Sequence, residues 1–147
     1  MTRVVASTLT GSPDVVALSP QFSHSYVHRP DERHNGTDTF DCDGVNIKRI
    51  VISGSIHVSS WGVSATATFK DGSEISLGGA SCYWVSGQYT SNSTSVTLYP
   101  DEKLTPSQMA SISRIEFDWS CSNNDYGNAT SSVSIVCYGN NINWKND

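Results

Sequence analysis

The densest group of titratable side chains in the sequence lies between residues 24 and 34. It contains three imidazoles and two carboxylates: His24, His28, Asp31, Glu32 and His34. Imidazole nitrogens and carboxylate oxygens bind zinc, and the same groups perform general acid–base chemistry. Pro30 prevents a helix from aligning the first two histidines. A hydrated loop is the usual structure for such a stretch, and a metal or catalytic site is the alternative.

A second polar group combines three aspartates with a glycine: Asp38, Asp41, Asp43 and Gly44. Calcium prefers several oxygen ligands on a short, flexible turn. No acidic residue follows at the far end of a twelve-residue loop, so a helix-loop-helix calcium site is excluded. The pattern allows a calcium site in a β loop, with a hydrated turn as the alternative.

Aromatic side chains stand among Ser, Thr, Asn and Gly, a mixture typical of sugar-binding sites. They are Trp61, Tyr83, Trp84, Tyr89, Tyr99, Tyr126, Tyr138 and Trp144. In the segment "SCYWVSGQY", strand alternation places Tyr83 and Val85 on one side and Trp84 on the other. We therefore expect Trp84 either to offer an exposed aromatic surface or to cover a second sheet, while about half of the aromatic residues belong to the core.

The segments "RIEFDWSC" and "SVSIVCYG" alternate apolar and polar residues in the way of half-buried strands. They predict a hairpin whose turn contains the polar stretch "SNNDYGNAT". In that register Cys121 and Cys137 lie on the same buried face as near neighbours, which leaves Cys42 and Cys82 as a second pair. The other pairings stay open, and so do four buried thiols, because the spacing of the cysteines does not decide between them.

Two further elements have clear signals. In "VSATATFKDGSEISLGG", the apolar residues Ala65, Ala67 and Phe69 must share one face of a hairpin with the apolar residues after the turn. Only an odd loop length allows this, which predicts a three-residue loop, Lys70-Asp71-Gly72, with Gly72 in the left-handed position. In "TPSQMAS", a Thr N-cap, a Pro at the first helical position and a Gln at the capping-box position predict one short helix near 106–112.

Turn signals recur along the whole chain and predict an antiparallel all-β sandwich of about eight strands, with a prism-like form as a variant. Further strands are expected at 2–9, 14–18, 46–58, 82–89 and 94–99, and long loops in the irregular region 24–44. Residues 1–147 are expected to form a single domain.

Composition and motifs exclude several function classes. Nine Lys and Arg residues are scattered singly and the net charge is -5, which argues against nucleic acid as a partner. No apolar run approaches the roughly 20 residues of a membrane span, and no signal peptide is visible, so a soluble chain is expected. The sequence lacks a nucleophile elbow, P-loop, HExxH, CxxC and dinucleotide-binding motif, so we do not expect an enzyme.

Two resemblances to lectins follow from these motifs. The strands "IKRIVISGSIHVSSWGVSATATFKDGSEISLGG", "VTLYPDEKL" and "ISRIEFDWS" resemble the strand order of jacalin-type β-prism lectins over about half of the chain. The segment "NDYGNATSSVSI" is similar to the last loop and strand of small calcium-dependent galactose-binding bacterial lectins, with Tyr126, Gly127 and Asn128 matching the motif. The second resemblance implies Asp125 and Asn128 as candidate calcium ligands.

The sequence therefore favours a non-enzymatic carbohydrate-binding β-sandwich module with glycans as its ligands. Its expected site residues are Trp84, Asp125, Tyr126 and Asn128. The alternative is a structural β domain of a virion, tail or surface assembly that forms homo-oligomers. A third hypothesis is a membrane-binding toxin domain, with clustered Trp and Tyr at the lipid interface.

Overall fold

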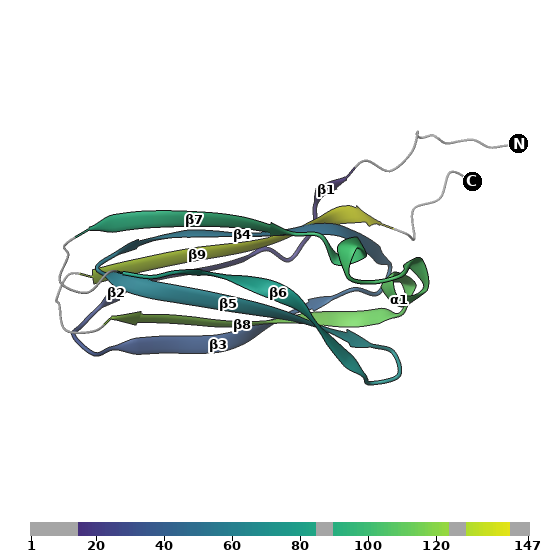
Figure 1. Ribbon diagram of the computed structural model, residues 1–147, viewed down its shortest axis with the longest axis horizontal. Coiled ribbons are helices and arrows are strands. Elements are labelled where there is room, and N and C mark those ends of the chain that lie inside the picture. The colour runs from purple at the N-terminus through teal and green to yellow at the C-terminus, as the bar shows by residue number, and fades with distance from the viewer. Residues whose placement is uncertain (1–14, 85–89, 124–128, 142–147) are drawn as a thin grey trace, which may run out of the picture.

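The protein forms two antiparallel β-sheets packed face to face (Figure 1). The computed structural model describes residues 15–84, 90–123 and 129–141. The five-stranded sheet contains β1 (Val16–Ala17), β2 (Phe22–His28), β9 (Ala129–Asn141), β4 (Val45–His57) and β7 (Ser91–Leu98). The four-stranded sheet contains β3 (Arg33–Asp41), β8 (Ile112–Asn123), β5 (Ser59–Phe69) and β6 (Glu74–Cys82).

The connections make this sandwich a jelly roll. The order β2-β9-β4-β7 in one sheet faces β3-β8-β5-β6 in the other, and from β2 onward every connection except the β5–β6 turn passes between the sheets. Eight strands wound in this way are the jelly-roll arrangement. The predicted all-β sandwich is confirmed, in its two-sheet form.

The inward positions of the central strands fill the space between the sheets. On β8, Ile115, Phe117 and Cys121 are fully buried, and on β4 the same is true of Ile50 and Ile52. Apart from Val51, their outward neighbours are Ser and charged residues. This two-residue alternation is what a half-buried strand requires.

The β5–β6 hairpin has the predicted three-residue loop. Phe69 N–H donates to the Ser73 carbonyl (2.8 Å), Gly72 N–H donates to the Phe69 carbonyl (2.9 Å), and Gly72 has φ +92°. Ala67 lies opposite Ile75. The parity of apolar residues decided the loop length correctly, because the alternative two-residue loop would have sent Ile75 to the opposite face.

The predicted helix is also present, as α1 (Pro106–Ala110), preceded by the 3-10 helix η2 (Pro100–Glu102). The N-cap Thr105 and Gln108 form a complete capping box: Gln108 N–H donates to Thr105 Oγ1 (3.2 Å), and Thr105 N–H donates to Gln108 Oε1 (2.8 Å). The helix ends earlier than 112 because Ile112 begins β8.

The predicted hairpin between β8 and β9 is wrong. These strands belong to different sheets, with β8 between β3 and β5 and β9 between β2 and β4. Cys121 and Cys137 do both face the core, but from opposite sheets. Alternation identifies the buried face of a strand, and in a sandwich the buried faces of both sheets meet in one core.

The long loops predicted for 24–44 are wrong as well, since most of this region forms β2 and β3. Strands at 46–58 and 94–99 are confirmed by β4 and β7. Of the strand expected at 14–18, Val16 and Ala17 form β1, and Leu18 N–H donates to the Cys137 carbonyl (2.8 Å). Of the strand expected at 82–89, Cys82 ends β6, and Tyr83 and Trp84 lie beyond it. Residues 2–9, 14 and 85–89 lie outside the described residues.

Close contacts with the paired strand β9 and with the facing sheet make Gly54 on β4 irreplaceable, since Ser132 lies on β9 and Trp61 lies on β5. A Cβ at this position would lie 2.1 Å from the Ser132 carbonyl oxygen and 2.9 Å from Trp61 Nε1. We expect Gly54→Ala to lower the free energy of unfolding by about 1–3 kcal/mol or more, because a backbone carbonyl must move. Chemical denaturation followed by circular dichroism measures this change.

Gly62→Ala on β5 is the matched control, since a Cβ there meets only Ser120 Oγ at 3.9 Å. This substitution should leave stability unchanged or raise it by about 0.5–1 kcal/mol. Equal stability losses in the two variants would contradict the packing derived for Gly54.

Candidate functional site

The turn between β2 and β3 creates a polar, aromatic section of the interior. The two strands are edge strands of opposite sheets: β2 pairs with β9 and β3 pairs with β8. His24, Tyr26 and His28 alternate on the inner side of β2, and His34 and Asp38 lie on the inner side of β3. Their side chains therefore meet between the sheets, where the rest of the sandwich holds mainly apolar residues.

Stacked rings give this section its shape. His34 lies flat against Tyr26 (ring centroids 3.9 Å apart, planes at 3°), and His24 lies against Trp119 (3.8 Å, 20°). Gly36 on β3 makes room for the indole, since a Cβ there would lie 3.0 Å from Trp119 Cζ2. Each imidazole is thus held in one plane by an aromatic neighbour.

His24 is engaged in an ion pair and does not join the other histidines. Its Nε2 lies 2.6 Å from Asp38 Oδ2, and both side chains are mostly shielded from solvent. Asp38 therefore points inward, whereas Asp41 is exposed and accepts a hydrogen bond from Asp43 N–H (2.9 Å) in a local turn. The predicted aspartate group for calcium does not converge, because positions 38 and 41 lie on opposite faces of β3.

His28 is only 2% exposed and is held by a chain of hydroxyls. Ser59 Oγ donates to the Thr130 carbonyl, Ser131 Oγ donates to Ser59 Oγ (2.7 Å), and His28 Nε2 lies 2.9 Å from Ser131 Oγ. Because Ser131 already donates its proton to Ser59, it must accept the proton of His28 Nε2. His28 Nδ1 then carries a lone pair, and it has no hydrogen-bond partner among the described residues.

Burial lowers the pKa of His28, and the nearby His34 lowers it further, while Glu32 acts in the opposite direction. The imidazole of His28 is therefore neutral at pH 7, in agreement with the tautomer that the hydroxyl chain imposes.

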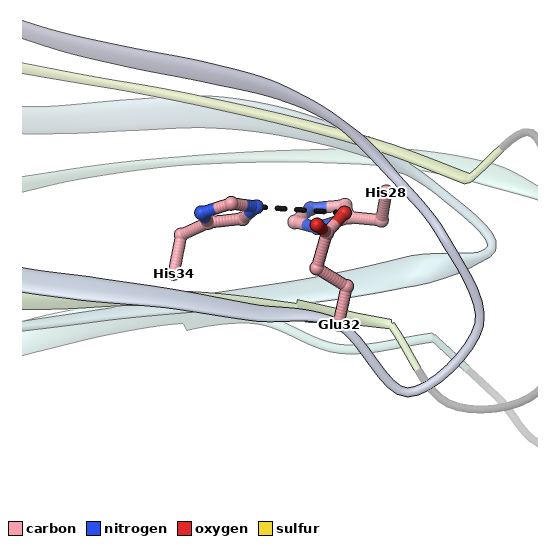
Figure 2. A group of neighbouring side chains, drawn as sticks. All are labelled: His28, Glu32 and His34. Atoms are coloured by element: carbon pink, nitrogen blue, oxygen red, sulfur yellow. Dashed lines mark ion pairs between the residues drawn. The ribbon is translucent and has the colours of Figure 1, made fainter.

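Glu32 and His34 complete the group at the tip of the turn (Figure 2). Glu32 Oε1 accepts a hydrogen bond from Arg29 N–H (2.8 Å) and lies 3.6 Å from His34 Nε2. The Arg29 amide is the main cause of a lowered pKa of the Glu32 carboxyl, which is therefore ionised at neutral pH. One ligand-type atom from each of His28, Glu32 and His34 lies within 4.8 Å of the other two.

The structure thus brings together three of the five titratable residues singled out between 24 and 34. His24 binds Asp38 instead, and Asp31 is an exposed turn residue with φ 60°. Among the described residues, the group formed by His28, Glu32 and His34 is the one whose donor atoms could hold a metal ion.

Of the four residues expected to bind carbohydrate, the structure describes one, Trp84. Asp125, Tyr126 and Asn128, with the calcium ligands implied there, lie outside the described residues. The Trp84 side chain is partly buried and packs against the core. The backbone N–H of Trp84 donates to Ser60 Oγ (3.3 Å). Its neighbour Tyr83, at 67% exposure, is the aromatic residue that faces solvent.

Tyr83 borders a shallow depression of about 530 Å³ on the outer face of the four-stranded sheet. Gly62 lies opposite Ser81, and Gly79 lies opposite Ser64 two positions along the same pair of strands. The floor of the depression therefore carries only glycines and small serine side chains. Asp118 and Ser120 lie on its rim. Sequence reasoning missed this surface because it depends on cross-strand neighbours.

A deeper cavity of about 640 Å³ is lined by residues of α1 and of the strand ends beside it. Figure 1 shows α1 at the end of the sandwich opposite the β2–β3 turn. Apolar residues such as Ile47, Leu104 and Met109 line the cavity together with Lys48 and Lys70. Its size is that of a small-molecule site, but the residues that line it do not form a catalytic group.

All four cysteines, Cys42, Cys82, Cys121 and Cys137, are buried free thiols in the structure. Burial raises the pKa of Cys42 and of Cys137 to about 12, and that of Cys121 to about 11. These thiols are therefore protonated at neutral pH, and a protonated, buried thiol is a poor nucleophile.

We expect Cys42, Cys121 and Cys137 to resist a thiol reagent at pH 8 in the native protein, and all four cysteines to react once it is unfolded. Counting modified thiols by mass spectrometry, with and without denaturant, measures this. A count of two in the unfolded, unreduced protein would instead demonstrate a disulfide.

No family model and no curated protein matches this chain. Among solved structures, it is similar to one of the Gx strain of infectious bursal disease virus, at 14% identity and a TM-score of 0.39, covering 93% of this chain and 35% of that one. The enzymatically active domain of tailspike protein 4 from bacteriophage CBA120 follows, at 13% identity and a TM-score of 0.38, covering 88% and 19%.

A desmodium yellow mottle tymovirus structure has 8% identity and a TM-score of 0.31, with 95% of each chain covered. This chain spans little more than a third of the infectious bursal disease virus chain. At such identities and TM-scores no family is assigned. The helices of the described residues are all too short, or too polar, to cross a membrane.

Proposed function

We propose that this chain is a structural β-sandwich domain that joins copies of itself into a larger assembly, such as a virion, tail or surface layer. The observation that carries the proposal is the open edge of β7. This strand pairs with β4 along its whole length, and no strand of the described residues pairs with its other edge.

An open edge presents a row of backbone N–H and C=O groups that can bind another strand. Monomeric β proteins usually block such an edge with Lys, Pro, a bulge or a very short strand. The β7 sequence "SNSTSVTL" has eight residues, contains no charged residue and no Pro, and keeps an unbroken register from Ser91 to Leu98. The edge therefore lacks the usual protections against pairing.

The outer face of the same sheet is also uncharged where β7 borders it. Two rows of serines cross the sheet, each with one serine from β2, β9, β4 and β7. The rows are Ser23, Ser134, Ser53, Ser95 and Ser25, Ser132, Ser55, Ser93. A second copy that paired through β7 would continue these rows without like-charge repulsion.

The simplest such contact is a two-fold pairing of β7 with β7 of another copy, in which the same surface serves both partners. With the axis near Thr94, Ser93 of one copy lies opposite Ser95 of the other. Main-chain hydrogen bonds then supply the affinity, as in other cases of strand addition.

We expect the double substitution Ser93→Lys and Ser95→Lys to weaken self-association about tenfold or more, because lysines of the two copies become cross-strand neighbours. Sedimentation velocity over a range of protein concentrations measures the dissociation constant. Both positions are exposed, so folding should be unaffected.

Ser64→Lys with Ser120→Lys adds the same charge to the outer face of the other sheet and is the matched control. It should associate like the unmodified chain. A chain that stays monomeric at high concentration, or a control that dissociates equally, would contradict assembly through β7.

Carbohydrate binding is the second candidate, and the depression beside Tyr83 is the observation that favours it. An exposed ring can stack on the apolar face of a sugar, while Asp118, Ser64 and Ser120 offer acceptors and donors to its hydroxyls. A floor of glycines lets a flat ring approach the sheet closely.

If this surface binds glycans, Tyr83→Ala should reduce affinity about tenfold through the loss of ring stacking. A glycan array followed by titration calorimetry provides the measurement. Tyr99→Ala, which removes an exposed tyrosine elsewhere, is the control. Failure to bind any glycan, or equal losses in both variants, would argue against this candidate.

A further inference from the structure

The tip of the β2–β3 turn has the composition of a transition-metal site. His28, Glu32 and His34 offer two imidazole nitrogens and one carboxylate oxygen within 4.8 Å of one another (Figure 2). Ligand atoms around one tetrahedral zinc ion lie about 3.3 Å apart, given bonds of about 2.0–2.1 Å. The 3.6 Å between Glu32 Oε1 and His34 Nε2 is close to this separation, and small side-chain rotations would close the remainder.

His28 supplies an independent sign that a ligand belongs here. Its Nδ1 is buried, carries a lone pair and has no partner among the described residues. Buried polar atoms without a partner are rare in native proteins. The opposite ring nitrogen donates into the Ser131–Ser59–Thr130 chain, which is the kind of outer contact that orients a metal-binding histidine and selects its tautomer.

The other two residues are also held in position. His34 is stacked on Tyr26, so its ring plane is determined before any ion arrives. The turn that carries Glu32 is fixed by the last residue of β8: Asn123 N–H donates to the Glu32 carbonyl (3.0 Å), and Asn123 Nδ2 donates to the Arg29 carbonyl (2.9 Å). A site whose ligands are positioned by surrounding contacts loses little order on binding.

The ligand types indicate the class of ion. Calcium and magnesium prefer sites made of oxygen ligands, whereas imidazole suits zinc, copper, iron and nickel. The Glu32 and His34 side chains are 33% and 30% exposed, which gives an ion a route from solvent and leaves room for a water ligand.

We propose that His28, Glu32 and His34 bind one divalent transition-metal ion, with zinc as the ion that the donor set suits best. His28 belongs to the five-stranded sheet, and His34 belongs to the four-stranded sheet. The ion therefore connects the two sheets at the edge where the short β2–β3 turn passes between them. This role does not depend on assembly through β7.

The test uses the full chain after treatment with a chelator and dialysis. We expect calorimetric titration with ZnCl₂ to give one site per chain, and saturating zinc to raise the melting temperature by about 5–10 °C. MgCl₂ at the same concentration should have no effect. Absence of zinc binding, or an equal response to magnesium, would overturn the proposal.

Substitutions locate the ion. Glu32 in the turn and His34 at the start of β3 are 33% and 30% exposed. Glu32→Gln and His34→Gln should each weaken zinc binding at least tenfold, with far-ultraviolet circular dichroism unchanged. Ser131→Ala removes the contact that orients His28 and should weaken binding about tenfold. His57→Gln removes a histidine on the outer face of the sheet and should bind zinc like the unmodified chain. Zinc binding that is retained in His34→Gln and lost in His57→Gln would overturn the assignment.

Discussion

The structure depends on the filling of the space between its two sheets. Trp61 projects from β5, is 1% exposed, and reaches the backbone of β4 at a point where only Gly54 allows it. Around this contact the inward aliphatic residues of β4, β8 and β9 close the core. Because interiors pack as densely as crystals, the separation of the sheets is set by such contacts along the whole sandwich.

The same constraint explains why the inner side of the β2–β3 edge is polar although most of its side chains are shielded from solvent. Side chains must fill the gap between the sheets there as well, and the chain uses rings: Trp119, Tyr26, His24 and His34 stack in place of aliphatic residues. Rings with nitrogen atoms bring hydrogen-bonding needs into the interior, which Asp38 meets for His24 and Ser131 meets for His28. The candidate metal ligands are thus a consequence of how this edge is packed.

The two surfaces of functional interest have different origins. The edge of β7 and its serine rows follow from strand composition and sheet order, and they concern contacts between copies. The ligands of the β2–β3 turn follow from the interior packing of one copy. A metal ion at the turn would hold the two sheets together inside each domain, while pairing through β7 would connect domains.

Much of the fold could be predicted from local patterns. The parity of Ala67 and Ile75 determined the length of the β5–β6 loop, and Thr105 with Gln108 located α1, because hairpin loops and helix caps involve residues close in sequence.

Alternation also identified the inward faces of β8 and β9. It could not tell that Cys121 and Cys137 belong to opposite sheets, since both sheets bury their faces in one core. The strands β2 and β3 escaped prediction because their inward residues are histidines, a tyrosine and an aspartate, whose burial depends on partners far along the chain. The sequence by itself thus determined the elements with apolar alternation or clear caps, together with their buried faces. The tertiary structure alone decided which strands are neighbours, and hence that His28, Glu32, His34 and Ser131 meet, because strand pairing is a long-range interaction that no local pattern encodes.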